Sequence, residues 1–378
     1  MSEPARLQWV DSARGACVFA VVLFHVCSWQ YLPMTDTVWA PASSIWGSLN
    51  SYLGWVRMPL LMAISGMLAG RRIGEGWGRP GAAVRAASSY YLYVVWLAVY
   101  AAFYLAARSS ELPHQIDSVG QFLLELLIPQ TPLWYVFALA LYVVVLTSLR
   151  RVRPVIVLTA LAVLSVAVQA IAPDWPMFEK VPVNAVYFAI GVYGGRQLRA
   201  LAERRRISDL LILSPVALGL AVILTLWSFG PVLDGAFQVL GGVMCIVLGV
   251  VVVVQLIRWR PVGTLAEFVG RRTLQIYVLH IPLIFVVLLV LTEDRVRDLG
   301  GVLQNPIVAA LWPVALAALV IGTALAVHRL LMVCRLKVLF EMPAAFRLAI
   351  NGTYAKRSAA VGAGDRPSPR TDRSERRS

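Results

Sequence analysis

The amino-acid sequence predicts an all-α integral membrane protein, a bundle of about ten transmembrane helices with both termini in the cytoplasm. Three observations predict this fold class. The 378 residues are 59% hydrophobic and only 14% charged, and their mean hydropathy is +0.73, so they carry too little polar surface for a soluble globule. Apolar runs of membrane-spanning length recur along the chain, and basic residues gather in alternate linkers between these runs.

Each apolar run is long enough to cross the hydrocarbon core of a bilayer, which takes about 20 helical residues. The runs are also much longer than the roughly 10-residue alternating segments of an outer-membrane barrel, so we expect a helical bundle. In chain order, the runs cover 13–32, 49–70, 88–107, 132–149, 154–172, 183–199, 208–228, 235–257, 272–292 and 306–333.

The positions of the basic residues predict the orientation, because Lys and Arg collect in the short loops on the cytoplasmic side. The linkers on the side of the N-terminus hold most of them, including Arg71 and Arg72. The linkers on the opposite side hold only Arg108, Lys180, Arg295 and Arg297. The net charge of +14 therefore follows the topology, and we expect the lipid bilayer as a partner and no nucleic acid.

Two segments are expected, a transmembrane domain over residues 1–345 and a disordered, basic cytoplasmic tail over 346–378. The tail is rich in Ala, Gly, Ser, Pro and Arg, a composition that cannot bury a core. The four cysteines lie in or beside apolar runs without the spacing of a metal site, so we expect neither a disulfide framework nor a bound metal. They are Cys17, Cys27, Cys245 and Cys334.

Ionisable side chains inside apolar runs are costly, about 2.5–3.5 kcal/mol for an Arg at a helix centre, so His25 in the first run needs a reason. Arg14 precedes it by eleven residues, which places both on one helix face with a rise of about 16 Å between them. An arginine binds phosphate, and a neutral imidazole can deprotonate a hydroxyl or accept an acyl group. The pair suits acyl transfer from a phosphorylated carrier. The alternative is an interfacial Arg14 and a His25 that bonds to a neighbouring helix.

Four motifs extend this pattern along nearly the whole chain. They are D-S-A-R-G followed by His25, R-M-P-L-L-M-A-I-S-G over 57–66, P-L-W-Y over 132–135 and Q-I-Y-V-L-H-I-P over 275–282. In this order and spacing they resemble the membrane-bound acyltransferase-3 family. The hallmark of that family is an Arg or Lys separated by ten residues from a His in the first helix, which Arg14 and His25 reproduce.

The resemblance implies catalytic roles for Arg14 and His25 in a bacterial plasma-membrane O-acyltransferase. It implies acyl-CoA as the co-substrate, with acetyl-CoA expected, and no bound cofactor. The acceptor would be a hydroxyl of a sugar, cell-envelope glycan, glycolipid or glycosylated natural product. His25 would act as a general base or as a transient acyl carrier, and the sequence does not choose between these roles.

Arginines and a serine of the second apolar run are further candidates for binding the donor or the substrate. Arg57 could clamp a phosphate or an acyl oxyanion, or it could form a buried ion pair or carbonyl contact. Ser65 could act as a nucleophile, although a small-residue contact that lets helices approach closely is the more common role. Arg71 and Arg72 could contact the phosphates of CoA, or could simply anchor the helix at the cytoplasmic interface.

Two later residues complete the candidate site. Trp134 could stack against a sugar or belong to an interfacial aromatic belt. His280 could reach the cavity of His25, where it would orient substrate or relay a proton, or it could be a packing residue.

Two other function classes fit parts of the sequence. Ten spans with intramembrane His25, Arg57 and His280 also suit a proton-coupled transporter or exporter, although repeat-related halves with broken helices are not visible. An acyl-binding structural subunit without turnover is a third class. Thioester consumption with product formation would indicate the enzyme, whereas substrate accumulation without chemistry would indicate transport.

Overall fold

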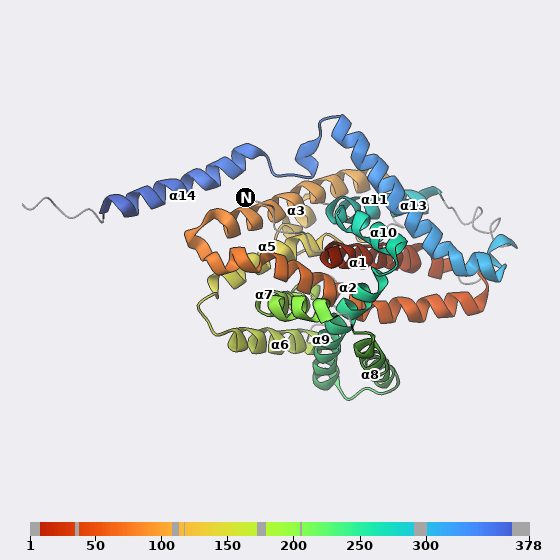
Figure 1. The fold of residues 1–378 in the computed structure, drawn as a ribbon. Helices are drawn as coiled ribbons and strands as arrows, with labels where there is room; N and C mark the ends of the chain where they lie inside the picture. Colours follow the sequence, from red (N-terminus) through yellow and green to blue (C-terminus); the bar gives the residue numbers. More distant parts are fainter. Residues whose placement is uncertain are drawn as a thin grey trace, which may run out of the picture.

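The computed structural model describes residues 8–34, 38–107, 113–116, 118–171, 179–204, 206–290 and 301–364. These residues form a bundle of helices and no strand, as the all-α class predicts (Figure 1). Helix α1 lies inside the bundle, where it packs against α2, α9, α10, α11 and α13.

Each of the ten apolar runs forms a helix. These helices are α1 (Gln8–Val26), α2 (Ala40–Glu75), α3 (Pro80–Ala107), α5 (Trp134–Ser148), α6 (Pro154–Ile171), α7 (Lys180–Arg204), α8 (Ile207–Leu226), α9 (Pro231–Leu256), α11 (Thr273–Val290) and α13 (Pro306–Val333). Among the described residues, 7 helical stretches are long and apolar enough to cross a membrane, and α5 and the apolar part of α8 are shorter. The number of ten spans and the cytoplasmic orientation of the termini stay predictions.

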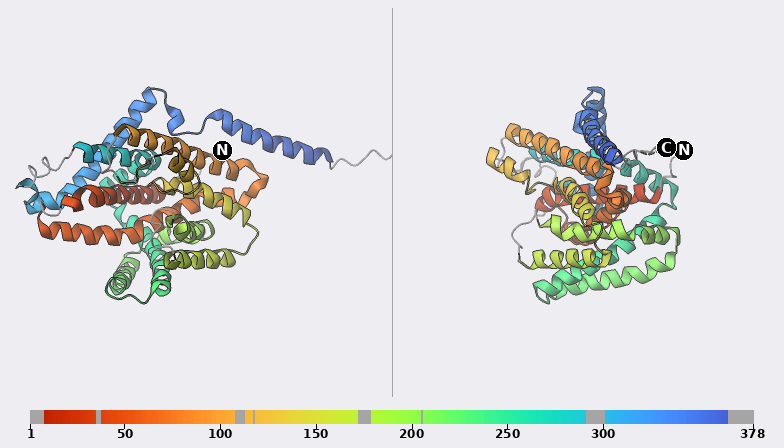
Figure 2. Two further views of the ribbon diagram at one scale, coloured as in Figure 1. Left: turned by 180° about the vertical axis from the view of Figure 1, so that it is seen from behind. Right: turned by 90° about the vertical axis from the view of Figure 1, so that its left-hand side faces the viewer.

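The described residues form three further α-helices without a counterpart in the sequence prediction: α4 (Val119–Glu125), α10 (Arg260–Gly270) and α14 (Ala344–Gly364). Helix α14 extends away from the bundle in Figure 1 and in the left view of Figure 2. It occupies much of the segment expected to be a disordered tail. Its sequence is rich in Ala, the strongest helix former, so a helix forms there without a core of its own. Residues 365–378 of the expected tail lie outside the described residues.

Glycines allow the close helix contacts that hold the bundle together. On α1, a Cβ added to Gly15 would lie 2.0 Å from the carbonyl oxygen of Ala266 in α10. Between α2 and α7, a Cβ on Gly66 would lie 2.0 Å from the Phe188 oxygen, and one on Gly191 would lie 1.8 Å from the Ala63 oxygen. Only glycine fits these positions, because any side chain would overlap backbone atoms.

The C-terminal end of α1 continues into a π-helical turn, Cys27–Tyr31. The hydroxyl of the buried Tyr31 donates a hydrogen bond of 2.8 Å to the carbonyl of Ala309 in α13. The turn is therefore fixed to a distant helix, and it places Trp29 against the ring of His25, with the ring centroids 4.6 Å apart.

Candidate active site

His25 lies in the last turn of α1, on the wall of a cavity of about 360 Å³. Its side chain is almost buried, with 8% of the residue exposed. Phe24 also packs against the ring, edge-on, at a centroid distance of 4.9 Å. The predicted residues Arg57 and Trp134 line the same cavity, so the structure brings three of the candidate residues together.

Hydrogen bonds assign the proton positions of His25 and His280. The Tyr277 carbonyl accepts from His280 Nδ1, at 2.5 Å, so in a neutral ring this nitrogen carries the proton and Nε2 is the acceptor. His280 Nε2 lies 3.3 Å from His25 Nδ1, and the Val21 carbonyl lies 2.9 Å from the same atom. His25 Nδ1–H therefore donates to both acceptors. The lone pair of His25 is left on Nε2, as a general base requires.

His280 is fully buried in α11 and is not among the described residues that line the cavity. It contacts the His25 ring but does not itself belong to that lining. This position favours orienting His25 over touching a substrate, the other role that the sequence left open.

The role of His280 can be tested by exchanging it for Gln or Leu. A glutamine keeps an oxygen that can accept from His25 Nδ1–H, whereas leucine leaves that donor with Val21 alone. A hydrogen bond is worth about 1 kcal/mol, so H280L should lower kcat by roughly 5- to 10-fold with KM unchanged. H280Q should retain more of the kcat, and equal losses in both variants would contradict the orienting role.

Several cavity residues were missed from the sequence because no motif or spacing marks them. Amide side chains come from three helices, α6, α7 and α9, and they are Gln169, Asn184 and Gln238. Lys180 begins α7, and Trp55 faces the cavity from α2. Cationic, amide and aromatic groups on different helices thus surround one space beside His25.

Arg57 is held by neutral groups. Its Nη1 donates to the backbone carbonyl of Asn50 at 3.1 Å and to the Asn50 side-chain oxygen at 3.3 Å. Its guanidinium carbon lies 4.0 Å from the centroid of the Phe24 ring. The carbonyl contact expected as one alternative is present, and the same side chain also reaches the cavity.

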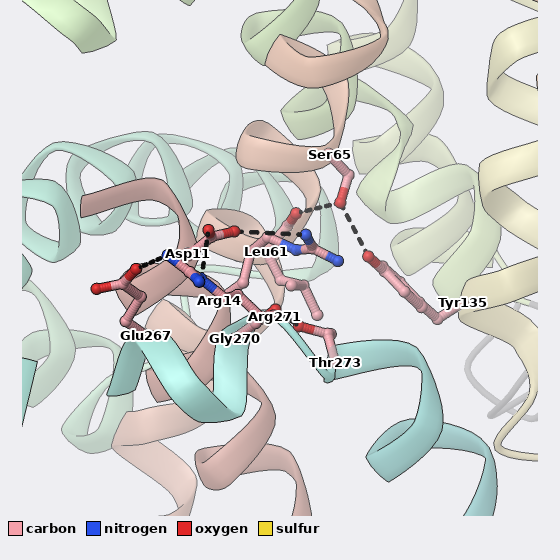
Figure 3. Close-up of polar contacts among 9 residues, drawn as sticks. All are labelled: Asp11, Arg14, Leu61, Ser65, Tyr135, Glu267, Gly270, Arg271 and Thr273. Atoms are coloured by element: carbon pink, nitrogen blue, oxygen red, sulfur yellow. Dashed lines mark hydrogen bonds and ion pairs between the residues drawn. The ribbon is translucent and has the colours of Figure 1, made fainter. Parts of the chain in front are cut away.

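Arg14 lies at the opposite end of α1, where it belongs to a charged cluster (Figure 3). The buried carboxylate of Asp11 lies 3.9 Å from Arg14 and 3.7 Å from Arg271, which also pairs with Glu267. The Arg14 side chain is 27% exposed. It therefore keeps access to solvent while Asp11 restrains it.

The two arginines at the end of α2 differ in their positions. Arg71 is 86% exposed at its side chain and pairs with Glu75 at 3.6 Å. Arg72 is close enough to Arg85 of α3 to act on it electrostatically, as is Arg14. The structure thus gathers Arg14, Arg72 and Arg85 at one end of the bundle. Arg85 was missed because it resembled other linker arginines in sequence.

Ser65 is hydrogen-bonded to Tyr135, a tyrosine that lies between the arginines and the two histidines. Its hydroxyl donates to the Leu61 carbonyl at 2.8 Å and lies 2.8 Å from the hydroxyl of Tyr135 (Figure 3). The Tyr135 ring is 5.1 Å from that of Tyr277, which is 5.6 Å from the ring of His280. Tyr135 is also close enough to Arg85 to act on it electrostatically, so polar and aromatic side chains run from the arginine cluster to His25. The close helix approach comes from the neighbouring Gly66.

The chain matches the family model of the acyltransferase domain over residues 7–329. The chain belongs to the acyltransferase-3 family. The resemblance noted from the four motifs is thereby confirmed. This acyltransferase-3 protein carries Arg14 and His25 on one unbroken α-helix, so the spacing of about 16 Å expected between them follows from the structure as well.

A curated relative of this acyltransferase-3 protein is the inner membrane protein YcfT of Escherichia coli strain K12. The two are 27% identical over 230 residues, which cover 57% of this chain and 63% of the relative. This chain thus spans less than two thirds of the relative's length. No solved structure gives a significant match. The family, the relative and the apolar helices together identify a multi-pass membrane protein.

Proposed function

We propose that the protein is an O-acyltransferase that moves an acyl group, with acetyl expected, from acyl-CoA to a hydroxyl of a sugar, cell-envelope glycan, glycolipid or glycosylated natural product. One observation carries the proposal. His25 lines a cavity whose walls carry amide and aromatic side chains and keeps the free lone pair of its ring on Nε2, while Arg14 lies toward the other end of the same helix.

The arginine cluster at the N-terminal end of α1 supports a site for the donor. CoA carries phosphates, and guanidinium groups bind phosphate in fork geometry. Arg14, Arg72 and Arg85 would hold these phosphates on the cytoplasmic side, and the thioester would extend toward His25. Arg71 would serve as a surface anchor, since its side chain is exposed and paired with Glu75.

In the proposed reaction, His25 Nε2 takes the proton of the acceptor hydroxyl as the hydroxyl oxygen attacks the thioester carbonyl carbon. The carbon–sulfur bond then breaks, and the proton passes from His25 to the departing thiolate, which leaves as CoA thiol. The Val21 carbonyl and His280 Nε2 accept from Nδ1–H and stabilise the transient imidazolium. The same two acceptors would also stabilise an imidazolium acylated at Nε2, so this arrangement serves a general base and an acyl carrier alike.

Purified protein in proteoliposomes with acetyl-CoA tests the proposal. Membrane extracts supply the acceptor, free thiol is measured with time, and mass spectrometry detects the acylated product. Thiol release that requires the extract supports acyl transfer. Uptake of an extract component without thiol release would indicate a transporter instead. An acylated His25 found by rapid quenching with acetyl-CoA alone would replace the base with the acyl carrier.

Arg14 provides a test of the donor site. Arg14→Ala should raise KM for acetyl-CoA by about tenfold or more, since a charge-assisted hydrogen bond contributes about 1.5–3 kcal/mol. Arg14→Lys should show the smaller change. Arg271→Gln is the matched control, because it removes the other cation beside Asp11, and Arg271 is not among the three arginines proposed to hold the phosphates. A normal KM in Arg14→Ala would exclude its role in donor binding.

A further inference from the structure

The described lining of the cavity beside His25 includes two cationic side chains. Arg57 enters it from α2 and Lys180 from α7, and no Asp or Glu is among its described lining residues. The two cations are close enough for Arg57 to act unfavourably on the charge of Lys180. Glu179 offsets part of the charge on Lys180 from outside the lining. An anion bound in the cavity between Arg57 and Lys180 would be attracted by both charges.

The guanidinium of Arg57 is also incompletely used. Its described hydrogen bonds all come from Nη1 and go to Asn50, and its ring contact is with Phe24. Within the described part of the chain, Nε and Nη2 donate to no protein group, and no carboxylate pairs with Arg57. These are the donors that form a fork with a carboxylate or a phosphate. Neutral partners thus hold the arginine in place, and its Nε–H and Nη2–H groups have no described protein acceptor.

We infer that the acceptor is an anionic carbohydrate, whose carboxylate or phosphate binds between Arg57 and Lys180 while a hydroxyl of its sugar ring faces His25. The inference rests on the proposed acyl transfer and narrows its acceptor class. The uncharged walls supply the rest of the recognition. Gln169, Asn184 and Gln238 offer amides for sugar hydroxyls, and Trp134 offers an aromatic face.

The donor does not account for these two cations. The arginines proposed to hold the CoA phosphates lie at the N-terminal end of α1, whereas Arg57 and Lys180 lie around its C-terminal end with His25. About 16 Å of helix separates Arg14 from His25. The two cations of the cavity are therefore separate from the proposed phosphate site of the donor.

A binding measurement tests the inference without requiring turnover. The full-length protein in neutral detergent is titrated with methyl β-D-glucuronide and with methyl β-D-glucoside, which differ in a carboxylate against a hydroxymethyl group. Ligand-detected NMR gives both Kd values. The wild type should bind the glucuronide about tenfold more tightly, as expected for one charge-assisted pair. Raising the KCl concentration should weaken only glucuronide binding.

Variants show which residues cause the preference for the glucuronide over the glucoside. Arg57→Gln and Lys180→Gln should each bring the two Kd values together and leave the Kd of the glucoside within about twofold. Lys180→Arg should keep the preference, which covers the case in which Lys180→Gln fails to fold. Arg153→Gln removes an exposed cation outside the cavity, and this variant should also keep the preference for the glucuronide. His25→Ala should retain the preference, so a loss of acyl transfer and a loss of anion binding are distinguishable.

The same titration is repeated with two further ligands, glucose 6-phosphate and dihexanoyl phosphatidylglycerol. Tighter binding of the phosphorylated sugar than of glucose, with the same dependence on Arg57 and Lys180, supports a sugar-borne anion. Equal Kd values for glucuronide and glucoside in the wild type would overturn the inference. So would a preference that survives in the R57Q/K180Q double variant. Binding of only the phosphatidylglycerol at these cations would assign them to a lipid headgroup and also overturn it.

Discussion

Replacing His25 with Ala is expected to lower kcat for acyl transfer by between about 10² and 10⁴-fold, the range that a general base contributes. The variant loses the imidazole that lines the cavity, whose Nε2 keeps a free lone pair in the assigned tautomer. The hydrogen bonds of His280 to the Tyr277 carbonyl and of Tyr31 to Ala309 do not involve His25, so the bundle should keep its packing. Thiol release from acetyl-CoA and the thermal unfolding midpoint in detergent measure the two effects.

His328→Ala is the matched control for this variant. His328 lies on α13 and packs against Phe340, away from the cavity. The His328→Ala variant should retain the kcat of the wild type. Full activity in His25→Ala would remove both the general base and the acyl carrier from the mechanism, because both roles need this imidazole.

Replacing Gly191 with Ala should destabilise the fold by about 3 kcal/mol or more, at the upper end of the cost of overpacking a core. The added Cβ would lie 1.8 Å from the carbonyl oxygen of Ala63, which belongs to the backbone of α2 and cannot rotate away. Helices α2 and α7 would have to separate. Since α2 carries Arg57 and α7 carries Lys180, the cavity should widen as well. The thermal unfolding midpoint in detergent checks the effect on stability.

Gly322→Ala on α13 makes the same chemical change where no atom lies within 4 Å of the new Cβ. Its unfolding midpoint should stay unchanged or rise slightly, because Ala favours a helix over Gly by about 1 kcal/mol. Equal midpoints for the Gly191 and Gly322 variants would mean that α2 and α7 do not pack as closely as their backbones indicate.

The sequence was sufficient to predict the ten helices that the apolar runs form and the placement of Arg14 and His25 on one of them. Apolar runs mark helices because the length of a span is a local property, and all ten runs form helices. Arg14 and His25 fall on one helix, so their relation follows from helical geometry alone. Helix α10 was missed because its eleven residues are too few for a span and include Pro261 and Gly263.

The parts of the site that join distant segments could not be predicted. His25 and His280 are 255 residues apart in sequence, and only the packing of α11 against α1 puts their nitrogens 3.3 Å apart. Lys180 was counted as one of the few basic residues on its side of the membrane. Its place on the cavity wall depends on where α7 begins relative to α2, which no periodicity encodes.

The π-helical turn after His25 has a consequence for aligning this chain with its homologues. Hydrogen bonds in such a turn span five residues instead of four, so the turn holds one residue more than an α-helical turn would. A homologue in which α1 stays α-helical throughout needs a gap of one position within 27–31. An ungapped alignment would pair the wrong residue with Trp29 and would shift every later position of that segment.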